Sequence, residues 1–501
     1  MQKPPRATNV ACMDFTNAKV KTRFPPSPTG SLHVGGARTA LYNFLIARKT
    51  GGEFMVRIED TDVERHQEHA VGKIIADLRW LGIQWDEGID VGGPNGPYRQ
   101  SERLEIYREH VDKLLSTGKA YCAFETAEEL DAMRKLAESR KQTFRYPRPD
   151  RLPTDEDVQR AKAQGRPVVV RFLCPQKDVA IHDDAFGEVV MQSSEMDDFI
   201  IRKADGYPTY HLANVVDDAL MGVTYIMRGQ EFLGQTWRHV LLREAFGFPE
   251  PGYCHLPLIM DMAGRKLSKR DGDVEVNAFR THGYLPETMV NFIALLGWNP
   301  GGQKERLTQK ELIELFSIER IGKANAKFDR DKLLAFNTDA IAASSQERLL
   351  AAFKDYLSLN DTPIPRGDDG LLRRLIDINH GMRTFADIPA KCGVLFGADD
   401  GFAYDPKAVE KVLKNGDSAP GLAVLAELRP RLAGCQWGVQ AIESLLKDYC
   451  RTKSLGMGKV AQPLRVAVTG GTISPPIYDT LVILGQAKTL ARIDRCLASC
   501  S

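Results

Sequence analysis

The 501-residue sequence lacks the signatures of several protein classes. Its nine cysteines are scattered, odd in number and never spaced as C-x-x-C, which argues against a disulfide framework and against a structural zinc site. The most apolar stretch, at 289–298, is much shorter than the roughly 20 residues that cross a bilayer. Residues 1–18 lack the apolar core of a signal peptide. We therefore expect a loose N-terminal extension, no membrane partner and a reducing, cytoplasmic location.

An excess of one charge is also missing. The chain has 67 Lys and Arg residues against 66 Asp and Glu residues, which leaves a net charge of +1. This balance excludes a protein that holds nucleic acid by bulk positive charge, although it permits a local basic face. The residues that are present, 43% hydrophobic and 27% charged, are typical of a folded globular protein. The length predicts about three to four domains.

The order of apolar segments predicts an α/β protein. A strand-like run at 20–24 precedes a loop with three prolines, and a helical pattern that contains Leu41, Phe44 and Leu45 leads to a second strand-like run at 54–58. Strand, glycine-bearing loop, helix and strand open a Rossmann-type parallel unit. We expect this domain to be split by an inserted α/β domain and followed by a helical region. The expected boundaries are 1–18 (extension), 19–108 and 212–255 (the two halves of the first domain), 109–211 (insertion), 256–340 (a further domain with a basic loop) and 341–501 (all-helical region).

Helical signals dominate after residue 280. Pro286 is expected to begin a helix, and Thr308 with Glu311 has the spacing of a capping box. Further helices are expected in the C-terminal third, for example at 442–449 and 477–490.

The first loop with chemical potential contains His33, Gly35 and Gly36 before the first helix. Glycines let a backbone approach phosphate closely, the helix end offers unpaired N–H groups, and an imidazole can donate to a phosphate oxygen. A Pro/Gly turn with a surface histidine would have the same pattern, so the loop alone is a weak motif.

The second loop is strongly basic. It runs through Lys266, Ser268, Lys269 and Arg270 and is flanked by glycines. Such a loop can close over a triphosphate and neutralise a departing pyrophosphate, although a solvated basic loop is the commoner reading when the cluster is taken alone.

Together, the two loops resemble the HIGH and KMSKS signatures of class I aminoacyl-tRNA synthetases. The resemblance narrows to the bacterial glutamyl-tRNA synthetases, strongly to about residue 300 and diffusely beyond it. The blocks that carry it lie at 27–30, 57–62, 80–82, 93–103 and 205–218. Two positions depart from the pattern: Gly36 replaces the second histidine, and Arg270 replaces the last serine. Some relatives bind zinc in the inserted domain, and Cys122 by itself cannot do so.

The resemblance implies a set of roles. ATP is the expected nucleotide substrate and arrives with Mg²⁺, while no resident metal is expected. His33 and Lys269 are expected to stabilise charge on the phosphates. The ATP site is expected to contain His33, Gly35, Gly36, Glu231, Lys266, Ser268, Lys269 and Arg270. The glutamate site is expected to contain Arg23 and Arg228 on the side-chain carboxylate, Tyr210 and Asn214 beside the substrate, Ser27 on a main polar group, and Glu59 on the ammonium group. Structural alternatives exist for single residues, such as a surface pair of Glu59 with Arg57 or a core role for Tyr210.

The implied reaction is formation of glutamyl adenylate from L-glutamate and ATP, followed by transfer to the terminal adenosine of tRNA(Glu). The family also suggests that tRNA binds before glutamate is activated, and we expect a monomer. The insertion would hold the acceptor end, the region after 255 the inner stem, and the C-terminal helices the anticodon. The expected basic contacts are Arg373, Arg374, Arg383, Lys411, Lys414, Arg429, Arg431 and Arg465, each of which also fits a solvated helix surface.

Four alternatives remain open at this stage. A glutaminyl-tRNA synthetase would carry an acidic residue at Ser27 and end in β-barrels. A truncated relative that modifies a tRNA base, or a free-standing nucleotidylyltransferase, would need fewer residues. A non-catalytic tRNA-binding paralogue would be free to lose His33, Lys269 or Arg228, which are present.

Choice between tRNAs is a separate hypothesis. Discrimination against tRNA(Gln) is thought to depend on an arginine in the anticodon-binding helices, and the corresponding position lies near Gly381. We therefore hypothesise relaxed or altered tRNA choice, with tRNA(Gln) as a second substrate. Arg383 is close enough to supply the guanidinium instead, and discrimination would then be kept.

Overall fold

A computed structural model describes residues 15, 18–28, 30–62, 68–268, 274–399, 401–415 and 420–500. The chain forms two compact units. Unit 1 contains residues 1–278 and 289–329, and unit 2 contains residues 279–288 and 330–501. Each unit has its own buried core, so each is described by itself.

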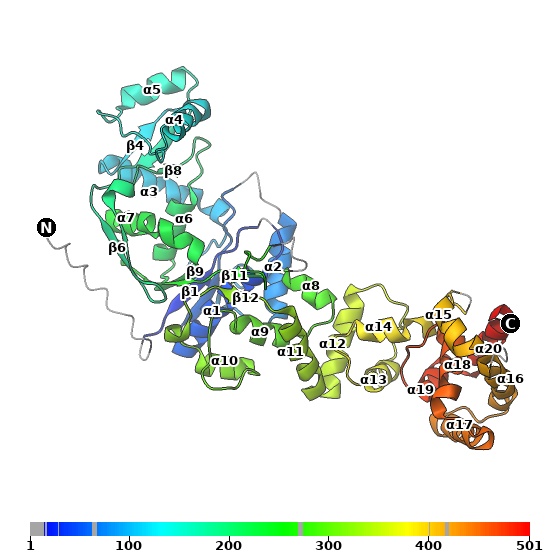
Figure 1. Cartoon of the computed structure of the whole chain (residues 1–501). Helices are drawn as coiled ribbons and strands as arrows, with labels where there is room; N and C mark the ends of the chain where they lie inside the picture. Colours follow the sequence, from blue (N-terminus) through cyan, green and yellow to red (C-terminus); the bar gives the residue numbers. More distant parts are fainter. Residues whose placement is uncertain are drawn as a thin grey trace. The chain divides into compact units, whose positions relative to one another are not determined.

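A parallel sheet forms the centre of unit 1 (Figure 1). Strands β1 (Lys21–Phe24), β2 (Glu53–Val56) and β3 (Glu87–Gly88) pair in the order β1-β2-β3, and β9 (Tyr225–Gly229) pairs with β10 (Gly252–Leu256). All of these pairings are parallel. The Thr224 N–H donates to the Lys21 carbonyl, which places β9 beside β1.

Helices connect these strands in the Rossmann manner. Helix α1 (Val34–Thr50) links β1 to β2, α2 (Glu68–Trp80) links β2 to β3, and α7 (Thr236–Phe246) links β9 to β10. Helix α6 (Tyr210–Leu220) precedes β9. The order in which successive strands are added to the sheet therefore reverses between β1 and β9, and this is the switch point where such sheets bind ligands. The predicted split Rossmann-type fold with a helical C-terminal region is confirmed, and the two predicted strands lie within a residue or two of β1 and β2.

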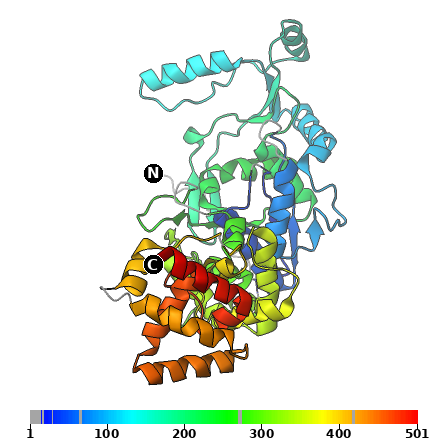
Figure 2. The same ribbon diagram turned by 90° about the vertical axis from the view of Figure 1, so that its right-hand side faces the viewer.

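The segment between the two halves of the sheet forms a smaller antiparallel sheet and a hairpin. The sheet has the order β4-β5-β8, and the hairpin joins β6 to β7. Two views show α4 and α5 at the end of this segment that lies away from the parallel sheet (Figures 1 and 2). The elements are α3 (Leu104–Ser116), β4 (Ala120–Ala123), α4 (Ala127–Ser139), α5 (Asp155–Ala163), β5 (Val169–Phe172), β6 (Val179–Asp183), β7 (Gly187–Met191) and β8 (Ile200–Arg202).

Asp198 connects the strands of the small sheet. Its buried carboxylate accepts hydrogen bonds from the Tyr121 hydroxyl at 2.9 Å, from Nε and Nη2 of Arg148 at 2.9 and 2.6 Å, and from the Cys174 N–H at 2.8 Å. Because this single group satisfies donors from three separate segments, it stabilises the small sheet.

We expect Asp198→Asn to lower the free energy of unfolding by about 3 kcal/mol, since a neutral amide cannot accept all of these bonds and leaves Arg148 without its anionic partner. Chemical denaturation measures this. Lys135→Ala, which removes an exposed pair with Asp131 on α4, is the control and should leave stability unchanged. Equal stability of the two variants would contradict the role of Asp198.

The remainder of unit 1 and its boundary carry short elements. The predicted helix start at Pro286 and the capping box of Thr308 with Glu311 are both observed. The elements are η2 (Gln100–Arg103), η3 (Ser193–Glu195), η4 (Gln230–Gln235), β11 (Ile259–Met260), α8 (Val276–Thr281), α9 (Pro286–Ala294), α10 (Gln309–Leu315), η6 (Ile318–Arg320) and β12 (Ala326–Lys327).

Unit 2 is helical, with one buried cluster around α12 and α13 and another around α16, α18 and α20. The stretch predicted as helical at 477–490 is two helices, because Gly485 has a left-handed φ of 86° that ends α19. The elements are α11 (Arg330–Ala343), α12 (Gln346–Leu359), α13 (Asp369–Ile378), α14 (Asp387–Cys392), η7 (Gly393–Leu395), α15 (Pro406–Ala408), η8 (Val409–Lys414), α16 (Pro420–Ala433), α17 (Val439–Lys453), α18 (Met457–Thr469), α19 (Ile477–Leu484) and α20 (Gln486–Cys500). Across the part of the chain that the structure describes, no helix combines the length and apolarity needed to span a membrane.

Candidate active site

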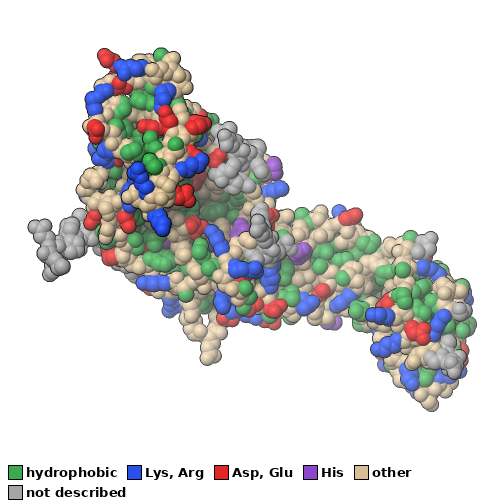
Figure 3. All heavy atoms as spheres, turned by 45° about the horizontal axis from the view of Figure 1, so that its top comes forward, with side chains coloured by type: hydrophobic (Ala, Val, Ile, Leu, Met, Phe, Trp, Pro, Cys, Tyr) green, Lys and Arg blue, Asp and Glu red, His purple; other side chains and the backbone are tan. Residues whose placement is uncertain are grey.

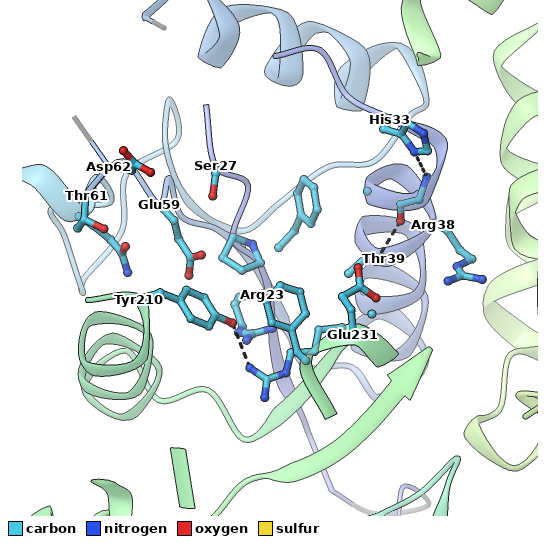
Figure 4. Close-up of a pocket in the computed structure, with 18 of the residues that line it drawn as sticks. Arg23, Ser27, His33, Arg38, Thr39, Glu59, Thr61, Asp62, Tyr210 and Glu231 are labelled. Carbon is cyan, nitrogen blue, oxygen red and sulfur yellow. Dashed lines mark hydrogen bonds between the residues drawn. The ribbon is translucent and has the colours of Figure 1, made fainter. Parts of the chain in front are cut away.

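A cavity of about 900 Å³ opens at the switch point of the parallel sheet. Arg23 on β1 and Arg228 on β9 lie near the carboxyl ends of neighbouring strands, where both line it. The space-filling view shows the surface of unit 1 hollowed in this region, with Lys and Arg side chains nearby (Figure 3). In the close-up, Glu59 and Tyr210 lie on one side of the cavity and His33 on the opposite side (Figure 4). The predicted site residues among its lining are Arg23, Ser27, His33, Gly35, Gly36, Glu59, Tyr210, Arg228, Glu231 and Lys266.

The first signature loop places His33 directly before α1. Its Nδ1 accepts a hydrogen bond from the Gly35 N–H at 3.0 Å and so caps the helix. A ring nitrogen that accepts from an amide carries no proton, so the neutral tautomer has its proton on Nε2. The histidine therefore presents an N–H donor beside the positive end of α1.

The second signature loop reaches the same cavity. The backbone of Lys266 forms an isolated antiparallel β-bridge with Met260, and its side chain is exposed. The buried Leu267 follows it. Ser268 ends this described segment, while Lys269 and Arg270 lie outside the described residues. The chain returns at Val274, whose carbonyl accepts from the Val34 N–H at 2.9 Å. Backbone pairing thus joins the first signature loop to the segment that follows the second, although more than 200 residues separate them in the sequence.

Arg23 lines the cavity, and the two terminal nitrogens of its guanidinium have no hydrogen-bond partner among the described residues. Its Nε donates to both oxygens of Asp218 at 3.1 Å, whereas Nη1 and Nη2 are buried without a partner among the described residues. Burial opposes ionisation of Asp218, but the charges of Arg23 and Arg57 outweigh it and lower the pKa of that carboxyl. The ionised Asp218 therefore holds Arg23 so that its terminal fork remains available for a carboxylate.

Glu59 and Asn214 act as a pair. The Asn214 amide donates to Glu59 Oε1 at 2.6 Å, and Arg57 Nη2 lies 3.5 Å from the same oxygen. Asn214 thus reaches the cavity through Glu59. Burial raises the pKa of Glu59 and outweighs the opposing charge of Arg57, so an incoming cation would restore a favourable environment for the carboxylate. The predicted surface pair of Glu59 with Arg57 exists, but it lies in the buried wall of the cavity.

Arg228 differs from Arg23, because protein groups already occupy most of its donors. Nη1 donates to the Tyr210 hydroxyl at 3.1 Å and Nη2 donates to Thr236 at 2.7 Å. The imidazoles of His255 and His239 accept from Nε and Nη1 at 3.1 and 3.3 Å. Arg228 therefore orients Tyr210. Four of its five N–H groups take part in these contacts, and one N–H of Nη2 does not.

Glu231 and Ser27 complete the predicted set. Glu231 lies on η4 directly after β9, exposed at the cavity, and its carboxylate lies where a side chain at Gly229 would stand. A side chain at 229 would therefore displace the Glu231 carboxylate from this position. Ser27 is exposed on the proline loop at the cavity edge (Figure 4).

Several lining residues were not predicted as site residues. They are Arg38, Thr39, Thr61, Asp62, Gln100, Lys203, Asp205 and Phe232. Asp62, Gln100 and Asp205 lie within the blocks that carry the family resemblance, and this was the available signal. Asp218, His239 and His255 act behind the lining through hydrogen bonds. Asp218 ends the block at 205–218, whereas the sequence offers no local signal for the two histidines. In the described ranges, no group of three or more His, Cys, Asp or Glu side chains is arranged to hold a metal ion.

Comparisons with known proteins show which family this chain is similar to. Residues 19–335 match the family model described as the catalytic domain of class I tRNA synthetases (E and Q), and residues 348–497 match an anticodon binding domain. The chain is 41% identical over 483 residues to a glutamate–tRNA ligase of Anaeromyxobacter sp., covering 96% of this chain and 99% of that protein. A glutamate–tRNA ligase of Porphyromonas gingivalis is 41% identical over 515 residues, covering 97% and 99%.

A solved structure supports the same relationship. The crystal structure of a glutamate tRNA ligase from Elizabethkingia meningosepticum in complex with its amino acid has a TM-score of 0.80 to this chain at 35% identity. The match covers 97% of this chain and 100% of that one. It extends through both units.

Proposed function

Because the chain belongs to the glutamate–tRNA ligase family of class I aminoacyl-tRNA synthetases, we propose that it activates L-glutamate with ATP and attaches it to tRNA(Glu). The relatives' shared name disfavours the glutaminyl alternative, and the length of the match disfavours the truncated relative and the free-standing nucleotidylyltransferase. The observation that carries the proposal is the Arg23 fork, whose two buried Nη groups have no partner among the described residues and suit the side-chain carboxylate of glutamate. We also propose a monomer that works in the cytoplasm.

The amino acid fits the cavity by charge. Arg23 binds the side-chain carboxylate, with Tyr210 oriented beside it by Arg228. Glu59, supported by Asn214, holds the α-ammonium group. Ser27 lies at the edge, where it binds a main-chain polar group of the substrate. These contacts direct the α-carboxylate toward the His33 loop.

The proposed reaction has two steps. An oxygen of the glutamate α-carboxylate attacks the α-phosphorus of ATP, the bond from that phosphorus to the β-bridging oxygen breaks, and pyrophosphate leaves with its Mg²⁺. A ribose hydroxyl of the terminal adenosine then attacks the glutamyl carbonyl and loses its proton, and AMP leaves. His33 donates from Nε2 to a phosphate oxygen as its charge grows, and the basic loop neutralises pyrophosphate. Gly35, Gly36, Glu231 and the 266–270 segment form the ATP site in this proposal.

His33 tests the catalytic assignment. We expect His33→Ala to lower kcat for tRNA charging by about 10²–10³-fold with little change in the KM for glutamate, since the lost donor acts mainly on transition-state charge. Charging with labelled glutamate, ATP and Mg²⁺ measures this effect. His110→Ala, which removes a half-buried histidine on α3 outside the cavity, is the matched control and should retain kcat. No charging of any tRNA by the unaltered protein would leave the non-catalytic paralogue as the function.

Glu59 predicts a pH dependence. Only the ionised carboxylate binds the ammonium group, and its pKa is raised by burial, so glutamate affinity is present above that pKa and is lost as pH falls through it. We expect Glu59→Gln to raise the KM for glutamate about 10- to 100-fold at neutral pH. In the unaltered protein, glutamate affinity should fall on the acid side at a pH above the one at which free glutamate itself titrates. Glu59→Gln should lose this fall. An unchanged fall in the variant would assign it to another group.

A second tRNA substrate is part of the proposal. Gly381 has a left-handed φ of 74°, where an arginine would be strained, so the guanidinium expected of a discriminating enzyme is disfavoured at this position. We propose that tRNA(Gln) is also charged with glutamate. Separate transcripts of the two tRNAs, with labelled glutamine as the control amino acid, decide this. A strict preference for tRNA(Glu) would overturn it and direct attention to the exposed Arg383.

The proposed anticodon contacts in unit 2 divide by their partners. Arg373, Arg374 and Arg429 pair with carboxylates on neighbouring helices, so part of their role is helix packing. Lys411 is exposed on η8 and is the better candidate for a phosphate contact. Four other basic residues remain candidates for tRNA contacts: Arg383, Lys414, Arg431 and Arg465.

A further inference from the structure

The surroundings of Arg228 contain a contact chain that leads away from the cavity. His255 on β10 accepts a hydrogen bond from Arg228 Nε at 3.1 Å and is fully buried. Its other ring nitrogen, Nδ1, lies 2.6 Å from Asp183 Oδ2, and the His255 backbone N–H donates to the same oxygen at 2.9 Å. The chain of contacts therefore runs from Asp183 through His255 to Arg228 and then to the Tyr210 hydroxyl.

The chemistry of these groups determines the proton on His255. A guanidinium has no acceptor, so Nε2 must accept, and an ionised carboxylate has no donor, so Nδ1 must carry the proton. Both neighbours thus select one neutral tautomer. Thr236 lies 3.2 Å from Nε2 and also accepts from Arg228 Nη2, which holds the guanidinium from a second direction.

Asp183 is well held in its turn. Its second oxygen, Oδ1, accepts from the N–H groups of Ala185 and Phe186 at 3.1 and 2.8 Å, and the carboxylate is fully buried. The residue ends β6, and β6 packs against α7 and β10 in the same hydrophobic core. The β6–β7 hairpin belongs to the segment between the two halves of the parallel sheet, so this segment supplies the buried acid that reaches Arg228 through His255.

The electrostatics favour the same arrangement. Burial lowers the pKa of His255, and the charge of Arg228 lowers it further, which outweighs the opposing effect of Asp183. Burial and Arg228 also lower the pKa of His239 well below its ordinary value. Both imidazoles are therefore neutral acceptors, and Arg228 keeps its positive charge uncompensated by any carboxylate in these contacts.

We propose that Asp183 and His255 are positioning residues for glutamate, because together they fix the plane of the Arg228 guanidinium and, through it, the Tyr210 hydroxyl. This inference rests on the proposed function of the cavity. Neither residue touches the substrate. Their effect is on binding of the substrate side chain, so a loss should raise the KM for glutamate more than it lowers kcat.

Substitutions at the two positions test this geometry. In Asp183→Asn, the amide NH2 replaces one of the two carboxylate oxygens. If the NH2 faces His255, it donates to Nδ1 and reverses the tautomer; if it faces the turn, it can no longer accept from the N–H groups of Ala185 and Phe186. We expect an increase of about tenfold or more in the KM for glutamate, with kcat and the KM for ATP changed less than threefold. His255→Leu removes the acceptor and should act in the same way, whereas His255→Gln restores an acceptor for Arg228 and should recover most of the affinity. Asp198→Asn, at a buried acid remote from the cavity, controls for lost stability and should retain the KM.

A second measurement is independent of catalysis. Nitrogen-15 NMR of the unaltered protein, with the His255 signals assigned by their loss in His255→Gln, should show the Nδ1–H tautomer and a proton shifted downfield by Asp183. An Nε2–H tautomer would overturn the proposal, and so would an unchanged KM in both Asp183→Asn and His255→Leu. If Asp183→Asn does not fold, the comparison of His255→Leu with His255→Gln decides. Failure of the unaltered protein to bind glutamate at all would instead refute the proposed function, which keeps the two failures distinct.

Discussion

Replacing Arg23 with lysine is expected to lower kcat/KM for glutamate by about three orders of magnitude while the protein remains folded. Lysine keeps a positive charge near Asp218, but it lacks the planar fork that offers two N–H groups to one carboxylate. Each hydrogen bond to a charged group contributes about 1.5–3 kcal/mol, so two of them account for a loss of this size. Steady-state charging of tRNA(Glu) at varied glutamate concentrations measures it.

Two further variants separate binding from folding. Arg23→Gln removes the charge and leaves Asp218 buried with one fewer cation, so the free energy of unfolding should fall by about 3–5 kcal/mol in addition to the loss of activity. Arg48→Lys on α1, which alters a more exposed pair with Asp86, is the matched control and should retain both properties. A KM in Arg23→Lys equal to that of the unaltered protein would place the substrate carboxylate elsewhere, and the remaining N–H of Arg228 would be the alternative.

Asp217→Ala is expected to be strongly destabilising, with a loss of about 3–5 kcal/mol in the free energy of unfolding. Its buried carboxylate accepts from Gln100, Arg103 and the Tyr107 hydroxyl at 2.9, 2.8 and 2.7 Å, and Arg57 Nε lies 3.5 Å away. Truncation would leave two buried guanidinium groups short of an anion. Thermal and urea unfolding measure the loss.

A surface ion pair provides the comparison for Asp217. Glu347 accepts from both terminal nitrogens of Arg373 at 2.6 and 2.8 Å, a geometry at least as good, but its side chain is exposed. We expect Glu347→Ala to leave the midpoint of unfolding unchanged within error, because water replaces the lost partner. Similar losses for the two variants would mean that burial is not the cause.

The parts of the site that could be predicted from sequence are those encoded locally. His33 caps the helix that the apolar spacing already predicted, and Gly35 and Gly36 lie in its first turn, so their position at its N-terminus follows from chain order. Arg23 and Arg228 were both predicted on the substrate carboxylate by resemblance, and this assignment stays a prediction. Their difference in hydrogen bonding has no local signal, because it depends on Asp218, His239 and His255, which come from other segments.

The sequence by itself determined the family, the order of strands and helices and the two signature loops, since these depend on residue type and short spacing. Only the tertiary structure decided which arginine keeps an open fork and which acid supports the other. The Arg23–Asp218 contact joins residues 195 positions apart, and the Asp183–His255 contact joins residues 72 apart. Buried polar groups take whichever partners the packed core brings within about 3 Å, and that proximity arises from the folding of distant segments rather than from their spacing along the chain.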